Sequence, residues 1–169
     1  MPKRASFNYN QTYRHRVKHL SFDLIPRQAL TTLFQDGRNS HILETFLQCY
    51  FVGFAKSGAN ASFDLLKLQG LEKLEVKTAT KNGVHICPSG MLGSQRTYNK
   101  TEHVKRLSQI DGVIIVDITK FPEISFRAIP SGDLIELVRK RSIRGFTANQ
   151  VQRLMKQKHG QNITIISEV

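Results

Sequence analysis

The sequence predicts an α/β fold, with a mixed central sheet flanked by helices and short extensions at both ends. Residues 113–116 are an unbroken β-branched run, typical of a strand buried on both faces. Residues 74–77 alternate apolar and charged side chains, as expected of a strand with one buried face. Helical patterns separate these strands, and 169 residues suffice for one domain with a sizeable core.

The first 39 residues predict a basic N-terminal arm. Lysines and arginines alternate there with Phe7, Tyr9 and Tyr13. Such a segment can order on DNA through Arg14 and Arg16, and a solvated tail is an equal alternative. Residues 26–34 have the pattern of a short helix.

Residues 40–130 predict the core of the domain. Ser40 is a good N-cap for a helix that Gly53 ends, and this helix should cover one face of the sheet. Its predicted apolar stripe is Ile42, Leu43, Phe46, Leu47, Tyr50 and Phe51. Residues 63–68 form the next expected strand, joined by a tight turn at Gln69 and Gly70 to strand 74–77. The remaining predicted elements are a strand at 84–86, a Gly- and Ser-rich loop at 87–96, a helix at 101–109 and strands at 113–116 and 124–129.

Residues 131–169 predict a helical extension. Ser131 should cap a helix over 132–141, and residues 144–146 should form a turn. A capping-box pattern at 147–150 opens a second helix. Its predicted inward residues are Val151, Leu154 and Met155, and its outward residues are Gln152, Arg153 and Lys156. This pair of helices has the outline of a helix-turn-helix, with packing on the core as the alternative, and residues 162–167 suggest an edge strand.

The predicted hairpin brings Asp64 beside Glu75, with Lys77 pointing the same way as Glu75. Two adjacent carboxylates repel each other and have raised pKa values unless a cation lies between them. Oxygen ligands suit Mg²⁺ or Mn²⁺, and a lysine beside them could orient or deprotonate an attacking water. The alternative is an exposed strand whose Glu-x-Lys pair is a surface ion pair, worth under about 1 kcal/mol.

Asp64 followed by Glu75-Val76-Lys77 resembles the signature of the PD-(D/E)XK nucleases. That superfamily includes restriction enzymes, homing endonucleases and Holliday-junction resolvases. Glu44 lies upstream in a helix where many members carry another acidic residue, although a glutamate there can also serve only the helix dipole. Phe63 departs from the pattern, since a proline often stands at this place. The resemblance covers residues 40–127.

The resemblance implies a restriction-endonuclease-like core and a metal-dependent active site. Asp64, Glu75 and the backbone carbonyl of Val76 would hold Mg²⁺ or Mn²⁺, Lys77 would position the water, and Glu44 would assist. It also implies a homodimer or higher homo-oligomer, because cutting two strands requires two sites. We expect a sequence-specific DNA endonuclease of the restriction or homing type, with a Holliday-junction resolvase as the alternative.

The composition indicates a nucleic-acid partner, here double-stranded DNA or a DNA junction. The chain has 25 Lys and Arg against 13 Asp and Glu, a formal net charge of +12, and such a surface attracts phosphate backbones whatever their sequence. A non-catalytic nucleic-acid-binding protein would explain the charge equally well. The candidate DNA-binding residues are Arg14, Arg16, Ser89, Ser94, Gln95, Arg96, Lys105, Arg153 and Lys156.

No membrane span or secretory signal peptide is expected. No apolar run approaches the ~18 residues of a membrane helix, so we expect a soluble intracellular protein in the cytoplasm of a prokaryote, with a phage or an organelle as other sources. Cys49 and Cys87 have no metal-binding spacing and are expected to be free thiols. His85 could face the scissile phosphate or be a surface histidine.

Overall fold

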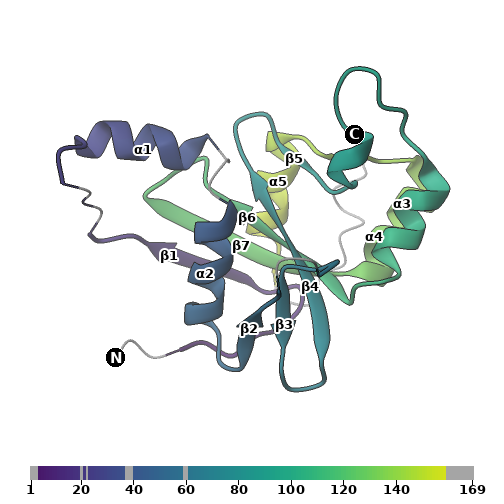
Figure 1. Cartoon of the computed structure of the whole chain (residues 1–169), viewed down its shortest axis with the longest axis horizontal. Helices are drawn as coiled ribbons and strands as arrows, with labels where there is room; N and C mark the ends of the chain where they lie inside the picture. The colour runs from purple at the N-terminus through teal and green to yellow at the C-terminus, as the bar shows by residue number, and fades with distance from the viewer. Residues whose placement is uncertain (1–3, 20, 22, 37–39, 59–60, 159–169) are drawn as a thin grey trace.

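The computed structural model describes residues 4–19, 21, 23–36, 40–58 and 61–158, and within them it confirms a mixed α/β fold. Figure 1 shows a curled sheet with helices on both faces. The sheet has the order β1-β7-β6-β4-β3-β2. Its strands are β1 (Thr12–Arg16), β2 (Phe54–Lys56), β3 (Leu65–Lys67), β4 (Glu72–Ala79), β6 (Gly112–Asp117) and β7 (Glu123–Pro130).

The predicted central strand is confirmed as β6, all of whose residues are buried. It pairs in parallel with β4 and antiparallel with β7. Its β-branched side chains therefore pack against helices on both faces of the sheet. The predicted hairpin is also confirmed, because β3 and β4 are antiparallel with Leu65 opposite Leu74.

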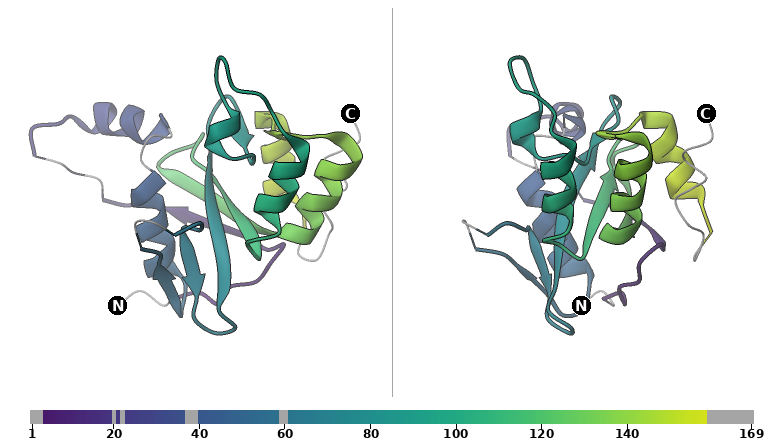
Figure 2. Two further views of the ribbon diagram at one scale, coloured as in Figure 1. Left: turned by 45° about the vertical axis from the view of Figure 1, so that its right-hand side comes forward. Right: turned by 90° about the vertical axis from the view of Figure 1, so that its right-hand side faces the viewer.

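The helices divide into two layers, as the two views of Figure 2 show. α2 (Ser40–Tyr50) covers the face that receives Leu74 and Val76 of β4. The opposite face packs against α3 (Lys100–Leu107), α4 (Ser131–Arg141) and α5 (Ala148–Lys156). Because side chains alternate along a strand, Glu75 and Lys77 lie on this second face. No helix within the described residues is long and apolar enough to cross a membrane.

The expectation of an N-terminal arm is wrong for residues 12–16, which form β1 on the edge of the sheet. β1 pairs antiparallel with β7. Tyr13 is buried and its ring stacks on Phe126, with centroids 5.5 Å apart. The aromatic residues that suggested a nucleic-acid arm are therefore part of the core. The short helix predicted in this region is confirmed as α1 (Arg27–Gln35).

Three further expectations differ from the structure. Residues 144–146 were expected to be a turn, but β8 (Gly145–Phe146) pairs with β5 (Val84–His85) in a separate two-stranded sheet. Ser131 does not cap α4, because it is already the first helical residue and its buried hydroxyl has no hydrogen-bond partner among the described residues. Ile42 was placed in the inward stripe of α2, but its side chain is 49% exposed. β2 was not predicted, and the expected strand at 162–167 lies outside the described residues.

The last described helix packs on the core as one of the two alternatives expected. Thr147 and Gln150 form the predicted capping box of α5, and its predicted inward residues are buried. The guanidinium of Arg127, fully buried on β7, donates to the carbonyl oxygens of Leu154 (3.4 Å) and Gln157 (3.0 Å). A buried cation thus satisfies the carbonyl groups that the end of the helix leaves without intrahelical partners.

The β5–β8 sheet gives a test of the fold. A Cβ at Gly145 would lie 2.0 Å from the carbonyl oxygen of Val84, so a side chain cannot enter without moving backbone. We expect Gly145→Ala to lower the free energy of unfolding by about 1–3 kcal/mol, as overpacking does, in urea denaturation. The matched change Gly132→Ala meets nothing within 4 Å in the first turn of α4 and should cost nothing. Equal stability of the two variants would contradict the close pairing of β5 with β8.

Candidate active site

Asp64 is the residue before β3, and its carboxylate continues the hydrogen bonding of the hairpin. Its N–H donates to the carbonyl oxygen of Leu74 at 3.0 Å. Its Oδ2 accepts the N–H of Val76 at 2.7 Å. The side chain therefore takes the place of a backbone acceptor where β3 no longer accompanies β4. This contact fixes the carboxylate beside the Glu75-Val76-Lys77 segment, as the sequence predicted.

Glu75 and Lys77 lie on the same face of β4 and contact each other directly. The Nζ of Lys77 is 2.6 Å from the Oε1 of Glu75, and the two side chains are 23% and 25% exposed. The pair is therefore partly withdrawn from water. An ion pair of this kind is compatible both with a structural role and with a catalytic lysine held beside a metal-binding carboxylate.

The pKa of Asp64 shows that the site carries more negative charge than its surroundings favour. The pKa of Asp64 is raised to about 6 from an ordinary value of 3.8, and burial is the largest cause. Nearby Glu75 and Glu44 contribute to this rise, while the Val76 N–H and Lys77 oppose it. A cation bound beside Asp64 would remove this cost of ionisation.

Glu44 reaches the same region from α2 and is 5% exposed. Its Oε2 lies 3.0 Å from the Nζ of Lys56 on β2 and 3.1 Å from the Nδ1 of His41. Lys56 thus partly neutralises the glutamate that the resemblance assigned to the site. No local pattern in the sequence predicted a role for Lys56, because the strand that positions it has only three residues.

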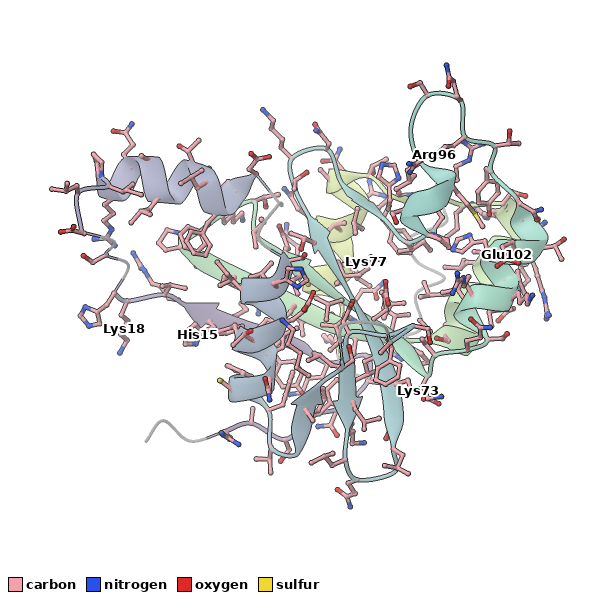
Figure 3. All side chains as sticks on the ribbon, viewed as in Figure 1. His15, Lys18, Lys73, Lys77, Arg96 and Glu102 are labelled. Atoms are coloured by element: carbon pink, nitrogen blue, oxygen red, sulfur yellow. The ribbon has the colours of Figure 1, made fainter. Side chains whose placement is uncertain are left out.

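A pocket of about 150 Å³ opens beside the Glu75–Lys77 pair, between β4 and α3. Figure 3 labels Lys77 together with Arg96 of the loop after β5 and Glu102 of α3. The pocket is lined by both polar and apolar residues. They are Ser62, Glu75, Lys77, Ile86, Pro88, Ser89, His103, Arg106, Leu107, Ile110 and Val113.

His103 and Arg106 line the pocket but were not among the predicted site residues. His103 is fully buried, its Nδ1 is 3.0 Å from the hydroxyl of Tyr98, and burial lowers its pKa, which favours the neutral ring. Arg106 lines the pocket, whereas the predicted Lys105, at the preceding position of α3, does not. Helical spacing relates the two lining residues, because residues three apart, such as His103 and Arg106, share one face of a helix.

The predicted DNA-binding residues do not form one surface. Ser89 lines the pocket, and the guanidinium of Arg96 donates to its carbonyl oxygen at 2.7 Å, which closes the loop that carries the exposed Ser94 and Gln95. Arg14 of β1 donates to the carbonyl oxygen of Met155 in α5 at 3.1 Å. The remaining residues are all exposed: Arg16 on β1, Lys105 on α3, and Arg153 and Lys156 on α5.

His85 lies on β5 and is exposed, and it does not line the pocket. Both described cysteines are free thiols, as expected, with Cys49 exposed and Cys87 buried.

Within the described residues, no group of three or more His, Cys, Asp or Glu side chains could hold a metal ion. A metal here would have two carboxylates, Asp64 and Glu75, and the carbonyl of Val76. In an antiparallel pair the N–H and C=O of one residue point toward the same neighbouring strand, so this carbonyl lies on the side of Asp64. Mg²⁺ commonly keeps several waters and binds through one or two carboxylates, so the donor set fits Mg²⁺.

Comparison with protein-family models, with curated proteins and with solved structures finds no match. The case for a function therefore depends on the residues of this site.

The raised pKa of Asp64 predicts how stability changes with pH. The protonated form is favoured in the folded state, so this contribution is complete below pH 3.8 and is lost as the pH rises through about 6. The full shift corresponds to about 3 kcal/mol, and partial exposure reduces it to about 1–2 kcal/mol. Without divalent metal at pH 7.5, we expect Asp64→Asn to unfold at a higher urea concentration than the wild type by this amount.

At pH 4 the difference between Asp64→Asn and the wild type should shrink. Mg²⁺ should raise the melting temperature of the wild type and leave that of Asp64→Asn unchanged. Glu136→Gln is the control, because Glu136 is exposed and Lys140 lowers its pKa, so this change should not stabilise the fold. A less stable Asp64→Asn at pH 7.5 would show that the carboxylate is needed for folding and not for binding a cation.

Proposed function

We propose that this protein is a Mg²⁺-dependent DNA endonuclease that hydrolyses phosphodiester bonds with a PD-(D/E)XK type of site. The observation that carries the proposal is the hydrogen bond from Val76 to Asp64, which holds the aspartate beside Glu75 and Lys77. The raised pKa of Asp64 gives this cluster a reason to bind a cation.

The order of elements supports the same proposal. The resemblance implies a helix, a hairpin, a second helix and a buried strand. α2, the β3–β4 hairpin, α3 and β6 follow in this order along the chain. The feature that matters chemically is the placement of Asp64 just before one strand and of Glu75 and Lys77 on the next.

Each residue of the site has a role that its position allows. Asp64, Glu75 and the Val76 carbonyl would hold Mg²⁺, which when bound stabilises the negative charge that develops on the phosphate. Lys77 would orient the attacking water by donating a hydrogen bond from its Nζ, and it could take up the proton that the water loses only after giving its own proton to solvent. The Val76 N–H keeps the Asp64 carboxylate in place throughout, and Glu44 contributes charge from behind it.

The substrate in this proposal is double-stranded DNA. Lys77, Arg106 and Ser89 border the pocket, where a phosphate beside the cleaved bond could be bound. The exposed Arg153 and Lys156 of α5 offer contacts further along a duplex. We propose sequence-specific cleavage of the restriction or homing type.

A Holliday-junction resolvase is the second candidate, and one observation favours it. The N-terminal region that suggested an additional DNA-reading arm folds onto the sheet as β1. The protein therefore has less accessory structure for reading a sequence than its residues indicated. The third alternative, a non-catalytic nucleic-acid-binding protein, gives Asp64 only its hydrogen bond from Val76 and leaves the cost of burying this carboxylate unexplained.

One experiment separates these functions. The protein is incubated with plasmid DNA and with a synthetic four-way junction, each with Mg²⁺ or with EDTA. Discrete plasmid fragments indicate sequence-specific cleavage, and paired nicks in the junction alone indicate a resolvase. Binding without Mg²⁺-dependent cleavage of either substrate would overturn the proposal in favour of a binding protein.

Glu75→Ala should abolish cleavage, because it removes one of two carboxylate ligands. DNA binding in Ca²⁺, measured by fluorescence anisotropy, should persist or improve, because the change removes negative charge near phosphate. Glu136→Ala, at an exposed glutamate of α4, is the control and should cleave normally. Wild-type cleavage rates in Glu75→Ala would refute the assignment of this residue.

Lys77→Ala should lower the single-turnover cleavage rate by about 10²-fold or more, the range typical of positioned proton-transfer groups. Mg²⁺ should still raise the melting temperature of this variant, because both carboxylates remain. Lys81→Ala removes an exposed lysine just after β4 and should leave the rate unchanged. A change of less than a few-fold in Lys77→Ala would mean that Lys77 is only the ion-pair partner of Glu75.

A further inference from the structure

We propose that the outer face of α2 is the surface through which two copies of this chain form a two-fold symmetric dimer. The inference goes beyond the cleavage chemistry by naming the interface. Its choice of partner rests on the proposed function, because cutting both strands of DNA requires two sites.

One side of α2 carries apolar side chains that the described chain leaves partly uncovered. Ile42 is 49% exposed and Cys49 is exposed, while Phe46 is half-buried and packs against Phe126, with ring centroids 5.9 Å apart. These residues line a groove of about 490 Å³. The full lining is His41, Ile42, Thr45, Phe46, Cys49 and Lys56.

The spacing of these residues extends the apolar stripe of α2 beyond the part that the sheet covers. Leu43 and Leu47 bury the inner part of the stripe against the sheet. Positions 42, 46 and 49 follow the helical period along the edge of the same stripe. Ile42 and Cys49 are therefore the part of the stripe that the described residues leave open to a partner.

The charge distribution favours a second copy as the occupant of this groove. With a net charge of +12, two copies repel each other over most of their surfaces. Residues 39–55 contain no lysine or arginine, although the chain has 25 such residues among 169. A segment without cations is a poor surface for phosphate groups, and two basic chains can approach there at a lower electrostatic cost than at their cationic surfaces.

Lys56 and Glu44 link the groove to the candidate active site. Lys56 lines the groove, and its Nζ lies 3.0 Å from Glu44, whose charge acts on Asp64. Figure 1 shows α2 lying across the sheet beside β2 and β3, the strands that lead into this site. Two helices packed across a two-fold axis lie about 8–10 Å apart. Such a dimer would carry two candidate active sites, one from each copy.

The test is the mass of the purified protein in the absence of DNA, by sedimentation equilibrium over a range of concentrations. We expect a dimer for the wild type and at least a tenfold weaker association for Ile42→Lys, which adds a cation beside His41 and Lys56. Circular dichroism and melting temperature should show that Ile42→Lys remains folded. Leu68→Lys makes the same change at a leucine that is 54% exposed in the β3–β4 hairpin and should remain dimeric.

A second measurement uses Cys49, which is exposed, whereas Cys87 is buried. A short bismaleimide should cross-link the native protein and Cys87→Ala into covalent dimers, and it should leave Cys49→Ala monomeric. A monomeric wild type, or a dimer that ignores both Ile42→Lys and Cys49→Ala, would overturn the inference. A dimer that fails to cleave any DNA would support this interface and refute only the nuclease proposal. A monomer that cleaves DNA with Mg²⁺ would support the nuclease proposal and refute this interface.

Discussion

The hydrogen bond from the Val76 N–H to the Asp64 carboxylate joins the fold to its candidate site. β4 has eight residues and β3 has three, so β4 continues beyond the point where backbone pairing with β3 ends. Asp64 supplies the acceptor at that point. On its other side β4 is fixed by parallel pairing with the buried strand β6. The carboxylate is thus held by the most rigid layer of the protein, which is the arrangement that a precisely placed metal ligand needs.

Buried charge is handled differently on the two faces of the sheet. On the α2 face, Glu44 is buried with a lysine and a histidine beside it. On the opposite face, Arg127 is buried and donates to carbonyl oxygens at the end of α5. Removing one partner of a buried charge usually costs more than the intact pair contributes, so both arrangements fix the position of a neighbouring helix. They hold α2 on one face of the sheet and α5 on the other.

The elements that the sequence predicted are those with a strong local signal. The β-branched run gave β6, the capping box gave α5, and the alternation at 74–77 gave the site-bearing part of β4. β2 and β8 have three and two residues and depend on partners distant in the chain, so no local pattern could show them. β1 was not predicted, because its arginines indicated an arm that binds DNA. Tyr13 and His15 nevertheless alternate with these arginines, as side chains of a strand do. At the site, the adjacency of Asp64, Glu75 and Lys77 was predictable from a hairpin, whereas Lys56 and His103 come from elements whose placement only the tertiary structure shows.

The position of β1 has a consequence for how copies of this protein meet in solution. β1 is one outer strand of the sheet, and an outer strand offers unused backbone groups to any other extended chain. Arg14 and Arg16 stand exposed along it, and β2 at the opposite edge is only three residues long. Cationic side chains and short edge strands both discourage the addition of further strands. The sheet is thereby protected from growing into aggregates by the addition of further strands.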